Sequence, residues 1–441
     1  MERTRLLGLA ALIFVILASY AVARPATESL FLEANGADKE PIAWLGVGIG
    51  SLIVVTLYNR WSAAIDLVRM FGFVSAISTG TLTLILLALG LETPGTTFGE
   101  WLSGAATLSD TTQNTLLVAG SAIDTAATHA NALAVWALYL WKDLYIVVLV
   151  EIFWSFANST VPKDRAKWWY GMFCVLGSLG GMAGNLGVGW LASTWSTQQS
   201  LWAVVPLLLF GGIGGFVLAR LTGVSGEPKA EPASIKDGFA VLKNSRALWL
   251  LMGLIGATQV AITLIDYQFK VAIEEFYPDV DARTAAIGKM YASIDVMALG
   301  LQLGTGPILR ILGVPLVLLA IPSLLGVAVA GYALVPRYAA IAAAKIASKA
   351  FDYSLFRAAK EILYIPLSHS EQTQGKAFVD MMSYRMAKGA TSVMLLGLIA
   401  MGEPQAALWL TMACIGLWIW ITVQLNRDST NPNPDEPKQL A

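Results

Sequence analysis

The feature that most constrains this chain is a series of apolar stretches, each about 20 residues long, separated by short polar segments. A helix needs about 20 mostly apolar residues to cross the hydrocarbon core of a bilayer. Twelve such spans are predicted, near residues 6–23, 41–58, 68–90, 133–157, 168–192, 201–220, 247–270, 284–306, 310–333, 338–366, 375–399 and 405–425. The pattern predicts an all-α polytopic membrane protein. The first span also has the basic start and small-residue end of a secretory signal peptide, so its cleavage stays open.

The composition excludes an ordinary soluble protein. Hydrophobic residues make up 56% of the chain and charged residues 13%, whereas soluble domains average about 25% charged. The net charge of −1 gives no indication of a nucleic-acid partner. Cys174 and Cys414 fall in apolar spans, and His129 and His369 lie far apart in the sequence. No metal, cofactor or enzyme activity is therefore predicted.

A polar segment divides the spans into two sets of six. The predicted organisation is an N-terminal half at 1–221, a cytoplasmic linker at 222–246, a C-terminal half at 247–425 and a disordered tail at 426–441. A weak repeat at an offset of about 209 residues pairs Asp143 with Asp352 and Lys167 with Lys376. Two six-helix halves are the layout of major facilitator transporters. We expect such a protein to work as a monomer surrounded by membrane lipid.

Basic residues in the short connections set the predicted orientation. One side carries Arg3, Arg5, Arg60, Arg69, Lys163, Arg165, Lys167, Lys229, Lys236, Lys243, Arg246 and Arg427. The connection at 91–130, on the other side, has four acidic residues and no Lys or Arg. Because cytoplasmic loops are enriched in Lys and Arg, both termini are predicted to lie in the cytoplasm of an inner-membrane protein.

Charged residues within the tenth and eleventh spans, at 338–400, are the strongest functional signal. A charge at the centre of a lipid-facing helix costs about 2.5–3.5 kcal/mol on insertion scales. Such residues therefore line a wet cavity, form pairs or lie near helix ends. Lys345, Lys349, Asp352 and Lys360 share one helical face. Lys349 is expected to pair with Asp352, and Arg357 with Glu361.

Sorting these charges by depth gives two groups of candidate site residues. The predicted substrate-binding residues are Lys349, Lys388, Asp352, Lys345, Lys142, Asp143 and Asp295. The predicted gating or pairing residues are Arg24, Glu151, Asp266, Arg357, Glu361, Asp380 and Arg385. The mid-depth charges fall in the fourth, eighth, tenth and eleventh spans, which face the central cavity in a facilitator-type bundle. For each charge, an internal salt bridge that holds the protein together is the alternative.

Three stretches carry a family resemblance: 24–36, 141–158 and, most specifically, 346–390. The last contains Tyr353-Ser354-Leu355-Phe356, Lys360-Glu361, Tyr364-Ile365-Pro366-Leu367, Gly375-Lys376-Ala377, Asp380 and Lys388. These motifs resemble the nucleotide transporter family of the ATP/ADP translocase type. The resemblance implies a twelve-helix, major-facilitator-like transporter whose basic cavity residues meet substrate phosphates, with Lys388 in that role.

The sequence departs from this family at three places. Asp352 stands where the family has a lysine, no lysine follows Arg24 closely, and Lys388 is followed by Gly389-Ala390 rather than Ser-Gly-Gly. These changes favour a divergent bacterial member with an anionic or zwitterionic small-molecule substrate.

The sequence therefore predicts a transporter that moves a small anionic solute, a nucleotide or related phosphorylated metabolite, by alternating access. Proton-coupled symport of a non-nucleotide organic metabolite is the alternative, with Asp143 or Asp352 protonated. A membrane enzyme or lipid-handling protein is not indicated, because no nucleophile, metal motif or phosphate loop is present. A structural or sensory membrane subunit is a further alternative.

Overall fold

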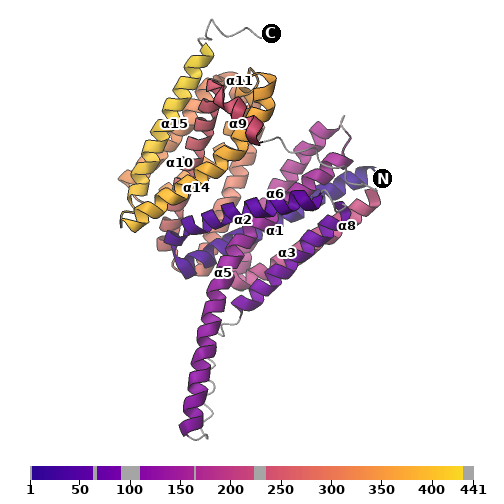
Figure 1. Ribbon diagram of the computed structural model, residues 1–441, viewed down its shortest axis with the longest axis vertical. Helices are drawn as coiled ribbons and strands as arrows, with labels where there is room; N and C mark the ends of the chain where they lie inside the picture. The colour runs from indigo at the N-terminus through magenta and orange to yellow at the C-terminus, as the bar shows by residue number, and fades with distance from the viewer. Residues whose placement is uncertain (1, 63–66, 91–109, 163–164, 223–234, 431–441) are drawn as a thin grey trace. The chain divides into compact units, whose positions relative to one another are not determined.

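The computed structural model describes residues 2–62, 67–90, 110–162, 165–222 and 235–430. Within these ranges the secondary structure is helical and no strand occurs (Figure 1). The long helices of the first half are α1 (Glu2–Asn35), α2 (Glu40–Ser62), α3 (Leu67–Leu89), α5 (Asp110–Thr160), α6 (Ala166–Thr194) and α8 (Val204–Thr222). Short helical segments are η1 (Ala37–Lys39), α7 (Thr197–Ser200) and η2 (Leu201–Ala203).

The second half begins with a short helix, α9 (Ile235–Lys243). Its longer helices are α10 (Arg246–Phe276), α11 (Val280–Leu334), α12 (Tyr338–Phe351), α14 (Lys376–Ala400) and α15 (Ala406–Thr430). A π-helical segment, η3 (Asp352–Phe356), joins α12 to α13 (Arg357–Leu363), and a second π-helical segment, η4 (Glu371–Gly375), precedes α14. The prediction of an all-α protein is confirmed.

Membrane spans can be recognised by helix length and composition. Among the described residues, nine helices are long and apolar enough to cross a bilayer. One of them, α11, contains two predicted spans, 284–306 and 310–333, and its helical geometry breaks at Gly313, near the start of the second span. Gly313 has φ 75°, a left-handed conformation that favours glycine. Neither α12 nor α14 is among the nine, because α12 has only 14 residues and α14 carries charges noted in 338–400.

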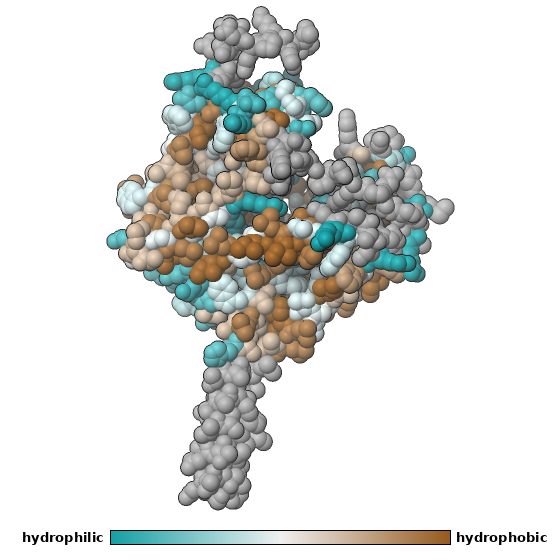
Figure 2. Space-filling view, in the orientation of Figure 1, coloured by the Kyte–Doolittle hydropathy of each residue, from teal (hydrophilic) through white to brown (hydrophobic). Residues whose placement is uncertain are grey.

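Apolar side chains on the helix surfaces agree with a membrane environment. Along α2, Ile49, Leu52 and Ile53 are 62%, 48% and 56% exposed. Figure 2 shows apolar side chains following this helix across the visible face. A soluble protein rarely exposes an apolar surface of this extent, so these residues are positioned to contact lipid.

Contacts divide the chain into two compact units. The first comprises 1–36, 49–228 and 279–289, and the second 37–48, 229–278 and 290–441. The start of α2 therefore groups with the second unit, and the start of α11 with the first. Each unit is described separately below.

In the first unit, α1 packs closely on α6. A Cβ atom added at Gly180 or Gly184 of α6 would collide with the backbone of α1 at Phe14 or Ala18. The four-residue spacing of these glycines is typical of such close helix packing in membranes. α1 is thereby fixed in the core of the unit, which positions the polar residues of its second half.

In the second unit, α10 is the central helix. Its N-cap is Ser245, whose side chain accepts a hydrogen bond of 3.2 Å from the backbone N–H of Leu248. Leu254, Ile255 and Ile262 are at most 1% exposed. Because α10 is enclosed by α12, α14 and α15, its polar side chains meet protein groups rather than lipid.

Two local expectations differ from the structure. Residues from Asp110 onward belong to α5, whereas a connection was expected throughout 91–130. The polar residues of this stretch suggested a loop, but its many alanines favour a helix. The tenth span, expected as one α-helix at 338–366, is interrupted by η3.

Candidate functional site

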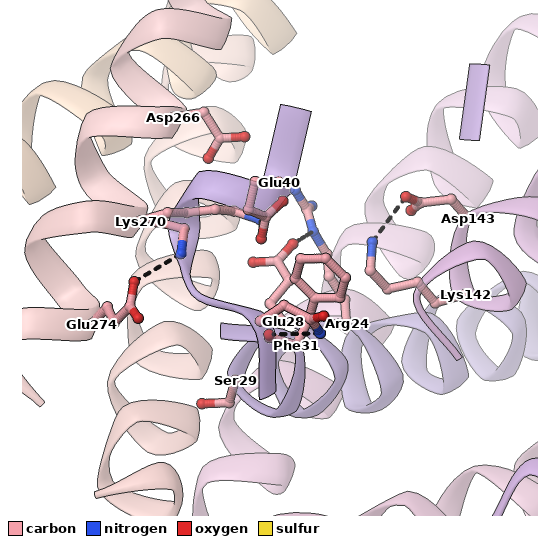
Figure 3. Close-up of polar contacts among 12 residues, drawn as sticks. Arg24, Glu28, Ser29, Phe31, Glu40, Lys142, Asp143, Asp266, Lys270 and Glu274 are labelled. Atoms are coloured by element: carbon pink, nitrogen blue, oxygen red, sulfur yellow. Dashed lines mark hydrogen bonds and ion pairs between the residues drawn. The ribbon is translucent and has the colours of Figure 1, made fainter. Parts of the chain in front are cut away.

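The first unit contains a group of polar side chains on α1 and α5, here called the α1–α5 cluster. It consists of Tyr20, Arg24, Glu28, Lys142 and Asp143. Arg24 Nε donates to Glu28 Oε1 at 3.1 Å, and Lys142 Nζ donates to Asp143 Oδ2 at 2.8 Å (Figure 3). The Tyr20 hydroxyl donates to Asp143 Oδ1 at 3.1 Å. Each charge in this cluster thus has a partner of opposite sign within four residues on the same helix.

The members of this cluster differ in how deeply their side chains are buried. The side chains of Lys142 and Glu28 are 3% and 4% exposed, whereas those of Arg24 and Asp143 are 22% and 21% exposed. Lys142 Nζ also lies 4.1 Å from the centroid of the Tyr139 ring, a cation–π distance. Arg24 and Asp143 are therefore the charged members with the greater access to solvent or substrate.

The second unit contains a longer row of polar contacts, here called the α10 cluster. Gln259, Asp266 and Lys270 lie on one face of α10, because their spacings are close to two turns and one turn. Gln259 Nε2 donates to Asp352 Oδ1 at 3.2 Å, and Asp266 pairs with Lys345. These contacts join α10 to η3 and α12.

The same row reaches the start of α2, which groups with this unit. Lys270 Nζ donates to Glu40 Oε1 at 2.6 Å, and the two side chains are 2% and 0% exposed (Figure 3). The Trp44 ring lies 5.9 Å from Lys270 Nζ and 5.7 Å from Lys388 Nζ. Trp44 is therefore a neighbour of two lysines, one buried and one, Lys388, exposed.

The π-helical segment η3 changes which charged residues of the tenth span share one helical face. A π turn inserts one extra residue and occurs frequently at functional sites. Before it, Lys345 is fully buried against Asp266. Within it, Asp352 accepts its hydrogen bond from Gln259, whereas pairing with Lys349 was expected. Lys349 Nζ lies 5.8 Å from the Tyr353 ring centroid.

Beyond η3, charge pairs link α13 to α14. Lys360 Nζ donates to Asp380 Oδ1 at 2.9 Å, and Lys376 pairs with Glu361. The expected pairing of Arg357 with Glu361 is wrong. Glu361 meets the lysine of the neighbouring helix, and the Arg357 side chain is exposed.

The remaining predicted residues lie outside the contacts that define the two clusters. Asp295 is half-buried on α11, Glu151 is exposed on α5, and Arg385 is exposed on α14. Within the described part of the chain, no group of three or more His, Cys, Asp or Glu side chains could hold a metal ion.

Sequence reasoning missed several members of both clusters. Tyr20, Glu28, Glu40, Trp44, Gln259 and Lys270 were not among the candidates. Two signals were available: the four-residue spacing of Arg24 and Glu28, and the shared face of three polar residues in the otherwise apolar α10. Trp44 and Glu40 gave no local signal, because their partners lie far away in the sequence.

The part of the second unit from α12 to α14 lies in a region that matches a known family. Residues 334–428 match the family model described as TLC ATP/ADP transporter. ADP,ATP carrier protein 3 of Rickettsia bellii (strain RML369-C) is 24% identical over 355 residues, covering 66% of this chain and 70% of that protein. ADP,ATP carrier protein 1 of Chlamydia pneumoniae is 24% identical over 342 residues, covering 66% of each chain.

This chain is similar to the ATP/ADP transporters. The resemblance predicted from 346–390 is confirmed, and with it the prediction of a membrane transporter rather than an enzyme. The aligned regions span about two thirds of the length of these relatives.

Solved structures bear on the fold. A bacterial homologue of the iron transporter ferroportin in its inward-facing state matches with a TM-score of 0.65 at 13% identity, covering 96% of this chain and 98% of the other. The nucleoside transporter NupG matches with a TM-score of 0.64 at 11% identity, covering 97% and 99%. At such identities the likeness shows the fold alone, and it confirms a major-facilitator-like, multi-pass membrane protein.

Proposed function

We propose that this ATP/ADP transporter relative moves a nucleotide, or a related phosphorylated metabolite, across the inner membrane by alternating access. The observation that carries the proposal is the set of lysines in the family-matching region. Lys345 and Lys360 are each held by a carboxylate from a neighbouring helix, and Lys388 is exposed. The relatives are named as ADP,ATP carriers, and lysines are suited to bind phosphate groups.

The mechanism rests on competition for these lysines. In the arrangement described, carboxylates neutralise buried ammonium groups, which would otherwise be costly in a low-dielectric interior. A substrate phosphate that approaches a lysine replaces its carboxylate partner and frees that carboxylate. Asp266 and Asp380 can then form different contacts in the alternate state. The substrate thereby shifts the conformational equilibrium through its differential contacts with the two states.

Exposed Lys388 is proposed as the first contact of the incoming phosphates. Its ammonium group lies beside the Trp44 ring, which restricts its position. Lys349 and Lys345 lie on α12 of the same unit. They are proposed to bind the substrate phosphates after Lys388 does.

Exchange transport provides the test. Proteoliposomes containing the full chain are loaded with ADP or left empty, and uptake of radiolabelled ATP is measured. The proposal predicts uptake that requires internal nucleotide and is lost in Lys345→Ala/Lys388→Ala. Equal uptake by that variant and the wild type would exclude a role for these lysines.

Proton-coupled symport of a non-nucleotide metabolite is a second candidate, favoured by one observation. The hydrogen-bond donor to Asp352 is the neutral amide of Gln259 rather than a lysine. A carboxyl held by an amide can exchange a proton without losing an ionic partner. This candidate predicts that uptake follows an imposed pH gradient in empty vesicles and that Asp352→Asn abolishes the response.

The orientation of the chain in the membrane and its oligomeric state are also proposed. Both termini are proposed to lie in the cytoplasm, with the chain working as a monomer divided at 222–246. A cytoplasm-active reporter fused after Ala441 is expected to be active in cells. An inactive reporter, together with an active periplasmic one at the same position, would reverse the orientation.

A further inference from the structure

A groove lies in the first unit between α2, α3 and α5, apart from the α1–α5 cluster contacts. It encloses about 240 Å³. Its walls include Leu57 and Trp61 of α2, Phe73 and Ile77 of α3, and Leu144 of α5. Leu57, Phe73 and Ile77 are 38%, 43% and 48% exposed. The groove therefore opens sideways, onto the apolar surface of helices that cross the membrane.

The walls of this groove offer few hydrogen-bonding groups. Trp141 Nε1 donates to the Ser78 backbone oxygen at 3.1 Å, inside the wall. The Tyr145 hydroxyl lies 3.3 Å from Ser19 Oγ, and the Tyr58 hydroxyl 3.4 Å from Ser155 Oγ. These aromatic residues thus present mainly carbon to the groove. Water needs two to four polar partners in a cavity, so an apolar occupant fits this space better than water or a nucleotide.

The position of the groove identifies the apolar occupant as a lipid acyl chain. A chain can enter from the bilayer between the exposed side chains of α2 and α3. However, lipid tails are as apolar as leucine side chains, so apolar contact alone gives little preference for the groove over the bilayer. A selective site therefore requires a polar contact with the headgroup.

Two arginines directly precede lining residues of the groove in the sequence and are candidates for that contact. Arg60 directly precedes Trp61, and Arg69 directly precedes Met70, which also lines the groove; both arginines are exposed. α2 ends at Ser62 and α3 begins at Leu67, so both arginines lie where the two helices connect. The rings of Trp61 and Phe73 meet at 5.6 Å in an edge-to-face arrangement. Aromatic residues beside arginines are typical of the membrane interface.

We propose that this groove binds one acyl chain of an anionic phospholipid whose phosphate headgroup is held by Arg60 and Arg69. The charge of the two arginines selects an anionic headgroup, and the carbon walls hold the chain. The site is separate from the transport pathway proposed above. Under the predicted orientation, the headgroup belongs to the cytoplasmic leaflet.

Native mass spectrometry of the purified full chain tests this site. The protein is mixed with equal amounts of dioleoyl phosphatidylglycerol and dioleoyl phosphatidylcholine in detergent. The wild type is expected to carry one phosphatidylglycerol in preference to phosphatidylcholine. Each arginine near an anionic lipid contributes roughly a fivefold preference, so Arg60→Gln/Arg69→Gln should lower the preference by about tenfold or more. Arg427→Gln, at an exposed arginine on α15, is the charge control and should leave the preference for phosphatidylglycerol unchanged.

A second pair of variants locates the acyl chain. Ile77→Trp should fill the groove and reduce the binding of both lipids. Leu84→Trp makes the same kind of change at a position on α3 that is 70% exposed and does not line the groove. This variant should bind both lipids as the wild type does. Both positions are exposed, so neither substitution disturbs the core.

Three results would overturn the proposal. They are equal binding of the two lipids by the wild type, a preference for phosphatidylglycerol that survives loss of both arginines, and normal lipid binding by Ile77→Trp. Displacement of phosphatidylglycerol by an equal concentration of inorganic phosphate would likewise show an anion site without a lipid chain.

Discussion

The two polar clusters neutralise their charges in different ways. In the α1–α5 cluster, Arg24 pairs with Glu28 along one helix, and Lys142 pairs with the adjacent Asp143. In the α10 cluster, the ion pairs join different helices: Lys270 meets Glu40 of α2, and Lys345 of α12 meets Asp266 of α10. The first arrangement fixes side chains locally. The second connects helices, so its contacts can report or drive helix movement.

This difference predicts which substitutions lower the stability of the protein and which lower transport alone. A pair within one helix can be lost without releasing that helix from its neighbours. A buried pair between helices leaves an uncompensated charge when one partner is removed, which is strongly destabilising. The Lys388 side chain, in contrast, is exposed, and its replacement is expected to affect transport more than folding.

The largest expected effect is on the buried pair of the α10 cluster. Glu40→Gln leaves the Lys270 ammonium without its carboxylate in a site that is 2% exposed, and should cost roughly 3–5 kcal/mol of stability. Thermal unfolding of the purified protein in detergent measures the loss. Glu28→Gln is the matched change in the α1–α5 cluster and should cost less, because its partner Arg24 is 22% exposed. Equal losses would remove the distinction between the clusters.

The next effect separates binding from folding within the second unit. Lys388→Gln should reduce ATP uptake by roughly ten- to a hundredfold, because hydrogen bonds to charged groups contribute about 1.5–3 kcal/mol. Its unfolding temperature should stay close to that of the wild type, since the side chain is exposed. Uptake rates in proteoliposomes and unfolding curves are compared for the same preparations. A variant that unfolds early but transports normally when folded would reverse this assignment.

A smaller effect is expected in the α1–α5 cluster. Tyr20→Phe removes the hydroxyl that donates to Asp143 Oδ1 at 3.1 Å, and should lower stability by about 1 kcal/mol. Thermal unfolding again provides the measurement. Tyr353→Phe, at a residue that is 39% exposed, is the control and should change stability less. If the two substitutions cost the same, the Tyr20 hydroxyl does not help to position Asp143.

The smallest effect lies in the connection before α14, outside both clusters. Partial burial acts to raise the pKa of Glu371, but hydrogen bonds from the side chains of Ser245 and Ser368 and from the Ser368 backbone outweigh it and lower that pKa below 4.5. A lowered folded-state pKa stabilises the protein above the unfolded pKa, and this contribution is lost as pH falls through the folded pKa. The unfolding temperature of Glu371→Gln should therefore be slightly below that of the wild type at pH 7. The gap should narrow below pH 4.5, and a gap that widens there would contradict this account.

Local sequence predicted most of the helices well. Spans near 20 residues and charges placed by depth depend on helical rise and period, which are properties of short segments. Partners across helices could not be predicted in this way: Asp266 for Lys345, and Glu40 for Lys270, depend on tertiary packing. The extra residue of η3 also shifts the helical phase between Asp352 and Lys360, which periodicity alone does not reveal. Arg357 and Glu361 had suitable spacing, yet Glu361 pairs with Lys376 of the adjacent helix.

The central claim is that lysines of the second unit recognise phosphate rather than the nucleoside. The most direct measurement is competition for radiolabelled ATP uptake in ADP-loaded proteoliposomes by equal concentrations of ADP, AMP and adenosine. The account predicts inhibition that decreases with the number of phosphates and is absent for adenosine. Lys388→Gln should weaken inhibition by ADP, whereas Arg337→Gln, at an exposed arginine before α12, should not. Inhibition by adenosine as strong as that by ADP would contradict the claim.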